Sequence, residues 1–254
     1  MNGLLPSQLS VRLAELGASH RLLVCTDYDG TLAPIAPRPE QAKLLPGAFN
    51  LLHELGRLPE TRVAVISGRS LDELRRHSGL GPPISLAGSH GAELPGFNPS
   101  DGMDGRKSKL DALEATLAPI CAPYPGTWIE RKPLGLAVHI RNCIQSDAEL
   151  IVSKLRNLPA EGQLMQAMEG KAVIEFSLSR ANKGDAVRFL RDCWSTDVRV
   201  VYFGDDTTDE TVFETLRGAD VGVKVGGGPT KANYRVTSED VALNALALLC
   251  QYRR

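Results

Sequence analysis

One stretch of the chain decides the fold: Leu22-Leu23-Val24-Cys25-Thr26-Asp27-Tyr28-Asp29-Gly30-Thr31-Leu32. It is an apolar run that ends in two carboxylates, and a glycine and a threonine follow directly. An apolar run of this length bounded by glycine predicts a buried strand of a parallel sheet. Such a strand delivers its last residues to the carboxyl edge of the sheet, where open α/β folds bind their ligands.

The two carboxylates, Asp27 and Asp29, are separated by a single residue. Residues at i and i+2 point to the same side of an extended strand, so both would face one site unless the chain turns between them. Two carboxylates this close resist joint ionisation unless a cation lies between them. The pair therefore indicates a hard divalent cation, and we expect Mg²⁺.

Composition places the chain among ordinary globular proteins. Its 254 residues, of which 43% are hydrophobic and 23% charged, suffice for one large domain or for a core domain with an insertion. The net charge of -1 gives no basic field that would attract nucleic acid or an anionic membrane. No apolar run reaches the roughly 18 residues of a membrane-spanning helix. We therefore expect neither a nucleic acid nor a membrane as partner.

The five cysteines are scattered, odd in number and without C-x-x-C spacing. This pattern argues against a disulfide framework or a zinc site, and Cys25 in its apolar run is expected to be an inert core residue. The first 17 residues lack the basic segment and long apolar stretch of a signal peptide, and they predict a short amphipathic helix instead. We expect a cytoplasmic monomer.

Further apolar runs end, like the first, in polar turns that contain glycine. The run 63–66 meets Ser67-Gly68-Arg69, and the run 84–87 meets Gly88-Ser89-His90-Gly91. Helical periodicity over 49–58, and over 70–78 with Ser70 as N-cap, separates these strands. Alternation of this kind predicts a Rossmann-like, doubly wound parallel sheet, which is an α/β fold.

The alternation stops near Pro95 and returns at Asn182. In the later part we expect strands over 198–203 and 221–225 and an edge strand over 234–236. Helices are expected over 183–192, over 211–216, and over 239–250 with Ser238 as N-cap.

The middle of the chain has a different pattern. After a linker rich in Gly, Pro, Asp and Ser over 95–107 come a helix over 110–117 and two pairs of strands, 127–130 with 136–140 and 164–168 with 172–178. A helix over 147–158 separates the pairs, with Leu150, Ile151 and Leu155 expected to face inward. We predict an inserted α+β domain over 99–179, within a core formed by 1–98 and 180–254.

Polar residues at the starts and ends of the core elements form a chemically coherent set. Its members are Asp27, Asp29, Ser67, Lys183, Asp205, Asp206 and Asp209. Carboxylates call for a divalent cation, while a lysine, a hydroxyl and backbone N–H groups suit a phosphoryl group. Together they indicate phosphoryl transfer with an aspartate as covalent nucleophile. The alternatives are helix capping by Ser67 and by the three later aspartates, and a solvated helix lysine at Lys183.

The order and content of these motifs resemble the haloacid dehalogenase superfamily of phosphotransferases. The resemblance implies that Asp27 is the nucleophile and that Asp29 is the general acid and base, which binds Mg²⁺ through its backbone carbonyl. It implies that Ser67 and Lys183 hold the phosphoryl oxygens. Asp205 would ligate the metal through its carboxylate, with Asp206 or Asp209 beside it. An insertion between the third strand and the lysine matches the position of the larger, C2-type cap domains.

A narrower resemblance is to the trehalose-6-phosphate phosphatase family. It rests on Asp27-Tyr28-Asp29-Gly30-Thr31-Leu32-Ala33-Pro34-Ile35, Ser67-Gly68-Arg69, Gly88-Ser89-His90-Gly91-Ala92-Glu93 and Gly204-Asp205-Asp206-x-Thr208-Asp209-Glu210. In the insertion, Glu130-x-Lys132 followed by His139, and Gly170-Lys171-x-Val173-x-Glu175, are similar to that family's cap motifs.

What the narrower resemblance implies is a Mg²⁺-dependent hydrolysis of trehalose 6-phosphate. Substrate binding falls to Arg69, His90, Glu130, Lys132 and Glu175, and the alternative for the last three is a set of surface salt bridges on a solvated sheet. A cap must move to admit a disaccharide, so the two crossings, 95–107 and 178–182, are the expected hinges. A phosphatase for sucrose phosphate or mannosyl-phosphoglycerate and a catalytically silent sugar-phosphate sensor remain as alternatives.

Overall fold

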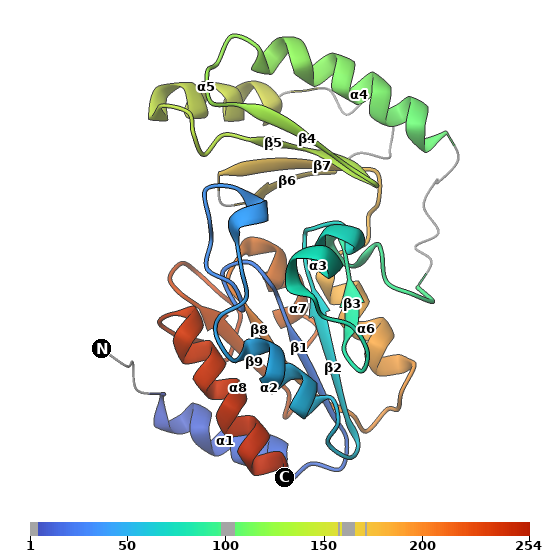
Figure 1. Cartoon of the computed structure of the whole chain (residues 1–254), viewed down its shortest axis with the longest axis vertical. Helices are drawn as coiled ribbons and strands as arrows, with labels where there is room; N and C mark the ends of the chain where they lie inside the picture. The colour runs from blue at the N-terminus through green and yellow to red at the C-terminus, as the bar shows by residue number, and fades with distance from the viewer. Residues whose placement is uncertain (1–4, 98–104, 157, 159–165, 171) are drawn as a thin grey trace. The chain divides into compact units, whose positions relative to one another are not determined.

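The computed structural model of the chain describes residues 5–97, 105–156, 158, 166–170 and 172–254 (Figure 1). It divides into two compact units. Unit 1 comprises Met1–Phe97 and Asn182–Arg254, and unit 2 comprises Asn98–Ala181. These boundaries lie one and two residues from those that the sequence predicts. The predicted hinge over 95–107 lies partly outside the described residues.

Unit 1 is built on a six-stranded, fully parallel sheet in the order β10-β9-β8-β1-β2-β3. The strands are β1 (Leu22–Thr26), β2 (Thr61–Ile66), β3 (Ser85–Ala87), β8 (Arg199–Gly204), β9 (Val221–Val225) and β10 (Tyr234–Val236). The opening stretch of the sequence thus forms a central strand, buried along its whole length between β2 and β8. Parallel pairing brings the carboxyl ends of β1, β2, β3 and β8 to one edge.

Helices cover both faces of this sheet because the side chains of β1 alternate between two cores. Leu22 and Val24 belong to the core that contains the apolar faces of α1 (Ser7–Gly17), α2 (Ala48–Leu55), α3 (Leu71–Ser78) and α8 (Glu239–Arg253). Leu23 and Cys25 belong to the core with α6 (Lys183–Asp192) and α7 (Glu210–Phe213). The doubly wound arrangement is confirmed, and α1 lies beside α8 (Figure 1).

Of the two helix caps predicted from the sequence, one is observed and one is not. Ser70 caps α3 in a capping box with Glu73, as expected. Asn182, which was not predicted as a cap, caps α6 in a capping box with Asp185. Ser238 does precede α8, but among the described residues its side chain makes no capping hydrogen bond. The prediction of its position before the helix is confirmed, and the prediction that its side chain caps the helix was wrong.

Unit 2 is an antiparallel sheet covered on one face by two helices. The sheet order is β4-β5-β7-β6, so the two predicted strand pairs join through β5 and β7. The elements are α4 (Arg106–Cys121), β4 (Trp128–Lys132), β5 (Gly135–His139), α5 (Gln145–Arg156), β6 (Gln166–Gly170) and β7 (Val173–Ser177).

One inward-facing residue of unit 2 was predicted wrongly. Ile151 and Leu155 are buried against the sheet, whereas Leu150 is 52% exposed. Ile151 and Leu155 are four residues apart and share one helix face, and Leu150 is rotated from that face by one residue.

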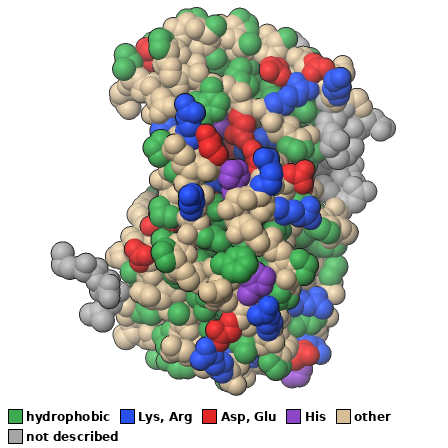
Figure 2. Space-filling model, in the orientation of Figure 1, with side chains coloured by type: hydrophobic (Ala, Val, Ile, Leu, Met, Phe, Trp, Pro, Cys, Tyr) green, Lys and Arg blue, Asp and Glu red, His purple; other side chains and the backbone are tan. Residues whose placement is uncertain are grey.

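The surface and the thiols agree with the composition. Lys and Arg side chains are interspersed with Asp and Glu on the face shown in Figure 2. All five cysteines are described and are free thiols, and full burial raises the pKa of Cys25 far above its usual value. No helix within the described residues has both the length and the apolar character needed to span a bilayer.

Candidate active site

Asp27 lies just beyond the carboxyl end of β1. Its N–H donates to the carbonyl of Phe203 at 2.8 Å, which continues the strand ladder by one residue. Its carboxylate oxygen Oδ1 then accepts the N–H of Tyr28 at 2.7 Å, so the chain turns here. The side chain is buried, and Nζ of Lys183 is 2.9 Å from Oδ1. The nucleophile that the family resemblance implies is therefore paired with the lysine that it implies.

Lys183, the first residue of α6, lies between two carboxylates. Its Nζ is 2.9 Å from Oδ1 of Asp27 and donates to Oδ1 of Asp209 at 2.8 Å, with the side chain only 2% exposed. Burial opposes the charge, but the two carboxylates outweigh it and raise the pKa of Lys183 above its usual value. Lys183 is therefore a fixed ammonium group.

Asp209 is fully buried and accepts three hydrogen bonds. Besides Lys183, the hydroxyl of Tyr202 donates to Oδ1 at 2.6 Å and the N–H of Asp206 donates to Oδ2 at 2.8 Å. Burial works against its ionisation, but Lys183 and Tyr202 together lower the pKa of Asp209. Burial and the nearby carboxylates raise the pKa of Tyr202, so that phenol remains a neutral donor. Asp209 thus holds Lys183 and the turn at Asp206 in place.

Asp205 approaches the backbone of the turn after β1. A Cβ added to Gly30 would lie 2.1 Å from Oδ2 of Asp205, and Gly30 has a φ of +75°. Both facts call for glycine, since only glycine combines a left-handed backbone with an absent side chain. The turns that follow the paired strands β1 and β8 thus pack against each other.

Asp27, Asp205 and Asp209 form the acidic cluster, in which all three are buried and their ligand oxygens lie within 4.8 Å of one another. Among the described residues, the ammonium group of Lys183 pairs with two of them, Asp27 and Asp209. Burial, together with Asp209 and Asp205, raises the pKa of Asp27 well above its usual value despite Lys183. Three carboxylates this close together suit a divalent cation, and oxygen-only donors are those that Mg²⁺ prefers. The residues therefore fit the ion.

Asp206 lies outside the acidic cluster. Its Oδ1 accepts the N–H of Thr207 at 2.7 Å, in the capping position of the short 3₁₀ turn Thr207–Asp209, and the residue is half-buried. This is the capping role that the sequence left open. Metal binding by Asp206 stays a prediction. The sequence left the choice open between Asp206 and Asp209 as the carboxylate beside Asp205, and of these two Asp209 belongs to the acidic cluster.

Asp29 and Arg69 form a bidentate ion pair. Nε and Nη2 of Arg69 donate to the two oxygens of Asp29, each at 2.7 Å, and Nη2 also donates to the carbonyl of Pro39 at 2.6 Å. The guanidinium lies 5.0 Å from the centre of the Tyr28 ring and is nearly buried. Burial opposes its charge, but Asp29 raises the pKa of Arg69. The chain turn after Asp27 therefore gives the two aspartates different cationic partners.

Ser67 and His90 join the loops that follow β2 and β3. Oγ of the buried Ser67 accepts the N–H of Arg69 at 3.1 Å, and the carbonyl of Ser67 accepts the N–H of His90 at 2.9 Å. The imidazole of His90 lies against Gly68, where an added Cβ would be 2.6 Å from Cε1. Phosphate binding by Ser67 and substrate binding by His90 and Arg69 stay predictions.

In unit 2, the sheet face opposite to α4 and α5 carries the predicted sugar-binding residues. Trp128, Glu130 and Lys132 alternate along β4, and strand register places Ala137 of β5 between Glu130 and Glu175. We call Trp128, Glu130, Lys132, His139 and Glu175 the polar face. The other face carries Leu136, Val138, Ile174 and Phe176, which pack in the core of this unit.

Two pairs of side chains cross the polar face. Nζ of Lys132 donates to Oε1 of Glu175 at 2.6 Å, and Nε2 of His139 is 2.7 Å from Oε2 of Glu130. The first pair reaches from β4 to β7 over Gly135 and Ala137 of β5, whose small size leaves room for it. The alternative of a salt-bridge set is thus realised in part, on side chains that are only 11–22% exposed.

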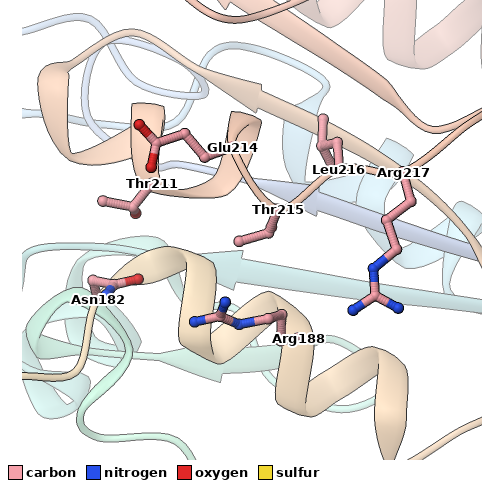
Figure 3. A pocket seen from close by; sticks show the side chains of 7 residues that line it. All are labelled: Asn182, Arg188, Thr211, Glu214, Thr215, Leu216 and Arg217. Atoms are coloured by element: carbon pink, nitrogen blue, oxygen red, sulfur yellow. The ribbon is translucent and has the colours of Figure 1, made fainter.

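A cavity of about 430 Å³ lies between α6 and the segment from Thr211 to Arg217 (Figure 3). Arg188 and Arg217 extend from its opposite sides. As far as the described residues show, its lining includes none of the acidic cluster. It borders instead the support of Lys183, because Asn182 caps α6 and Oγ1 of Thr211 accepts the N–H of Gly184 at 3.2 Å.

Sequence reasoning missed Tyr202 and Lys224. Lys224 is only 4% exposed and donates to the carbonyl of Asp206 at 3.2 Å and to Glu210 at 3.4 Å, so it braces the turn that follows β8. A lysine inside the apolar run Val221–Val225 was an available signal. Tyr202 gave none, because a tyrosine in a buried strand usually serves only packing.

Comparison with known proteins decides the family. A model of the family described as trehalose-phosphatase matches residues 25–242, which include every residue of the acidic cluster and of the polar face. The chain belongs to the trehalose-phosphatase family. This finding confirms the resemblance to that family and the fold class predicted from the motifs.

Curated members of the family differ in length from this chain. The bifunctional trehalose-6-phosphate synthase/phosphatase of Thermoproteus tenax is 35% identical over 228 residues, which are 88% of this chain and 31% of that protein. The trehalose-phosphate phosphatase of Mycobacterium tuberculosis is 31% identical, over 97% of this chain and 65% of its own length. The trehalose-6-phosphate phosphatase of Escherichia coli K12 is 32% identical, over 83% and 79%. The chain thus spans about a third of the Thermoproteus protein and about two thirds of the mycobacterial one.

Solved structures support the fold. The C-terminal domain of trehalose-6-phosphate phosphatase from Candida albicans has a TM-score of 0.83 at 24% identity and 99% coverage of both chains. A trehalose-6-phosphate phosphatase related protein has a TM-score of 0.72 at 27% identity, over 90% of this chain and 97% of that one. The sucrose-phosphatase of Synechocystis, at 22% identity and a TM-score of 0.57 over 91% and 98%, shares the fold.

Proposed function

We propose that this protein is a Mg²⁺-dependent phosphatase that hydrolyses trehalose 6-phosphate to trehalose and phosphate through an aspartyl-phosphate. The observation that carries the proposal is the buried pairing of Asp27 with Lys183 inside the acidic cluster, in a chain of this family. A buried carboxylate held by a fixed ammonium group, with two further carboxylates beside it, suits a metal-assisted nucleophile.

In the first step, a carboxylate oxygen of Asp27 attacks the phosphorus atom and the bond from phosphorus to the sugar oxygen breaks. Asp29 gives its proton to that leaving oxygen. Lys183 and Ser67 hold the phosphoryl oxygens as negative charge redistributes. When bound at Asp27, Asp205 and the backbone carbonyl of Asp29, Mg²⁺ would neutralise part of the phosphoryl charge.

In the second step, Asp29 takes a proton from a water molecule whose oxygen attacks phosphorus, and the bond to Asp27 breaks. Asp29 therefore needs to gain and lose a proton. Its bidentate pairing with Arg69 holds both carboxylate oxygens in one orientation. For the first step Arg69 must release Asp29, because Asp29 has to carry a proton. If Arg69 then bonded to oxygen atoms of the substrate, it would have the binding role that the resemblance implies.

Sugar recognition falls to Glu130, Lys132 and Glu175 of the polar face and to His90. Glu130 and Glu175 can accept hydrogen bonds from neighbouring sugar hydroxyls, and Lys132 can donate to their oxygens. In the free protein, Glu175 bonds to Lys132 and Glu130 bonds to His139. A sugar would therefore exchange one satisfied network for another, which limits the desolvation cost of binding.

The function is tested by measuring phosphate release from trehalose 6-phosphate, sucrose phosphate, mannosyl-phosphoglycerate and glucose 6-phosphate, with Mg²⁺ and with a chelator. We expect trehalose 6-phosphate to have the highest kcat/KM and the chelator to abolish turnover. Faster release from another sugar phosphate would mean that this compound, and not trehalose 6-phosphate, is the substrate. Binding without any release would support the silent sensor.

The nucleophile is tested by Asp27→Asn. The amide keeps the shape but cannot form an acyl phosphate, so we expect release to fall to the background rate. An unchanged rate would exclude Asp27 as the nucleophile.

A monomeric, cytoplasmic protein is also part of the proposal. The five free thiols support a reducing compartment such as the cytoplasm. Gel filtration tests the oligomeric state, and cell fractionation tests the location.

A further inference from the structure

On the polar face, His139 lies flat on the indole of Trp128. The two ring centroids are 4.1 Å apart and the ring planes differ by 3°. The residues face each other across β4 and β5 as a register pair. Cross-strand aromatic contacts of this kind fix the orientation of both rings.

The orientation of the His139 ring aims one nitrogen at Glu130. Nε2 is 2.7 Å from Oε2 of Glu130, and the side chains of both residues are largely buried, at 14% and 22% exposure. An ionised carboxylate can only accept a hydrogen bond, so Nε2 must carry the hydrogen whether the imidazole is neutral or charged. The contact therefore specifies the tautomer of His139 as well as the position of Glu130.

The contact also favours the ionised form of Glu130. Burial alone would raise the pKa of this carboxyl, but the hydrogen bond from His139 and the charge of Lys132 outweigh burial and lower it. Oε1 of Glu130 takes no hydrogen bond from the described residues, so one oxygen stays available as an acceptor.

We propose that Trp128 and His139 are positioning residues that hold Glu130 as an ionised acceptor for a pair of sugar hydroxyls. The inference rests on the proposed function, because it assigns to Glu130 the sugar of the substrate. Trp128 sets the ring plane of His139, His139 sets Oε2 of Glu130, and Oε1 meets the substrate. Neither positioning residue needs to touch the sugar.

Steady-state kinetics test the proposal. We expect His139→Ala to raise KM for trehalose 6-phosphate about tenfold, since a hydrogen bond to a charged group is lost, and to leave kcat within about twofold. His139→Gln retains an N–H donor and should restore most of the affinity. Trp128→Leu should act like His139→Ala, and Trp128→Phe, which keeps a flat ring, should act more weakly.

Two controls separate positioning from general damage. Hydrolysis of p-nitrophenyl phosphate, which has no sugar, should be the same in all these variants. His139→Ala should have no further effect on KM in a Glu130→Gln background, because residues of one network are not additive. An unchanged KM in His139→Ala beside a raised KM in Glu130→Gln would overturn the proposal, and so would equal losses on both substrates.

A readout without substrate keeps this proposal distinct from the proposed function. In ¹⁵N spectra of histidine-labelled protein, assigned with His139→Gln, we expect His139 to carry its hydrogen on Nε2. A neutral ring protonated on Nδ1 would overturn the inference even in an active enzyme. If this tautomer is found but trehalose 6-phosphate is not hydrolysed, the proposed substrate is wrong, and the KM comparison is made with the sugar phosphate that the panel identifies.

Discussion

At Gly30 the backbone of the turn after β1 lies close to the carboxylate of Asp205. The φ of +75° and the 2.1 Å that would separate an added Cβ from Oδ2 of Asp205 impose two separate penalties on any other residue. Gly47 has a similar φ of +86°, but no described atom lies within 4 Å of the position of its Cβ. The two glycines therefore distinguish backbone strain from steric exclusion.

We predict that Gly30→Ala lowers both stability and Mg²⁺-dependent activity. The left-handed backbone costs about 1–2 kcal/mol in each alanine variant. Displacement of Asp205 adds about 1–3 kcal/mol at Gly30 alone, as in other overpacked sites. Urea unfolding and the Mg²⁺ concentration for half-maximal phosphate release measure the two effects. Gly47→Ala is the control and should change only stability; equal behaviour of the two variants would contradict this view of Gly30.

The pH dependence of unit 2 is predicted from Glu130, whose pKa is lowered from its ordinary 4.5. A carboxylate with a lowered pKa contributes stability that is complete above the ordinary value. That contribution is lost as the pH falls through the lower, folded-state value. We expect the free energy of unfolding of wild type to exceed that of Glu130→Gln by a constant amount above pH 5 or so, and this excess to shrink in acid.

The measurement is urea unfolding followed by the fluorescence of Trp128 in a Trp194→Phe background. A stability difference that grows as the pH falls would show that the ionised carboxylate is not the stabilising form. Lys154, whose Nζ donates to the hydroxyl of Tyr124 at 2.7 Å on the surface of this unit, offers Lys154→Gln as a control without that acid dependence.

At the residue scale, the sequence predicted identities better than partners. Asp27, Lys183 and Asp205 were predicted as catalytic or metal-binding residues, and the fold brings them together at one edge of the sheet. The pairing of Asp29 with Arg69 was not predicted. It depends on a turn after Thr26, and the hydrophobic periodicity of the sequence does not indicate that turn. The stacking of His139 on Trp128 depends on strand register, which also becomes visible only in the fold.

Among the elements, α6 combines a structural and a chemical task. Its N-cap Asn182 accepts the N–H of Asp185 at 3.0 Å, and the next residue is Lys183. Oγ1 of Thr211 fixes the N–H of Gly184, so the first turn is held on two sides. The position of the Lys183 ammonium group thus depends on a capping box rather than on the body of the helix.

We predict that Asn182→Ala destabilises the protein by about 1 kcal/mol, as the loss of a helix cap does, and lowers kcat because Lys183 becomes less well placed. The checks are urea unfolding and phosphate release at saturating Mg²⁺. Ser238→Ala is the matched control, because that N-cap side chain makes no capping bond with the described residues. It should change neither quantity measurably. A stability loss with unchanged kcat would mean that the cap does not position Lys183.

The element pattern of the core was predictable because its strands are buried on both faces and its turns contain glycine. Both α6 and β9 have the bounds that the sequence predicts. Unit 2 was less predictable. Its helix α4 extends from Arg106 to Cys121, well beyond the expected 110–117, because its apolar periodicity is weak and Pro119 does not end it. The joining of two hairpins into one sheet is a tertiary event that local patterns do not specify.

On the scale of the whole molecule, Mg²⁺ binding at the acidic cluster would be coupled to folding. The three buried carboxylates come together only in the folded chain. A ligand that binds only the folded form stabilises it by about 2.7 kcal/mol at one hundred times its Kd. We therefore predict that Mg²⁺ raises Tm and that EDTA reverses the increase, as measured by scanning calorimetry.

Two variants define which carboxylates are responsible. Asp205→Asn should abolish the Mg²⁺-dependent increase in Tm. Asp206→Asn should retain it, because the amide oxygen can still accept the N–H of Thr207. The reverse result would mean that Asp206, and not Asp205, binds the metal.

The strand order has a consequence for the time course of synthesis. β1 pairs with β2 and with β8, and the whole of unit 2 is translated between these two partners. Unit 2 is one continuous stretch with a core of its own, so it can fold while β1 still has an unpaired edge. A nascent chain therefore carries an incomplete active centre and an exposed hydrophobic strand until β8 leaves the ribosome. Slow translation between β2 and β8 would lengthen its exposure to aggregation and to chaperones.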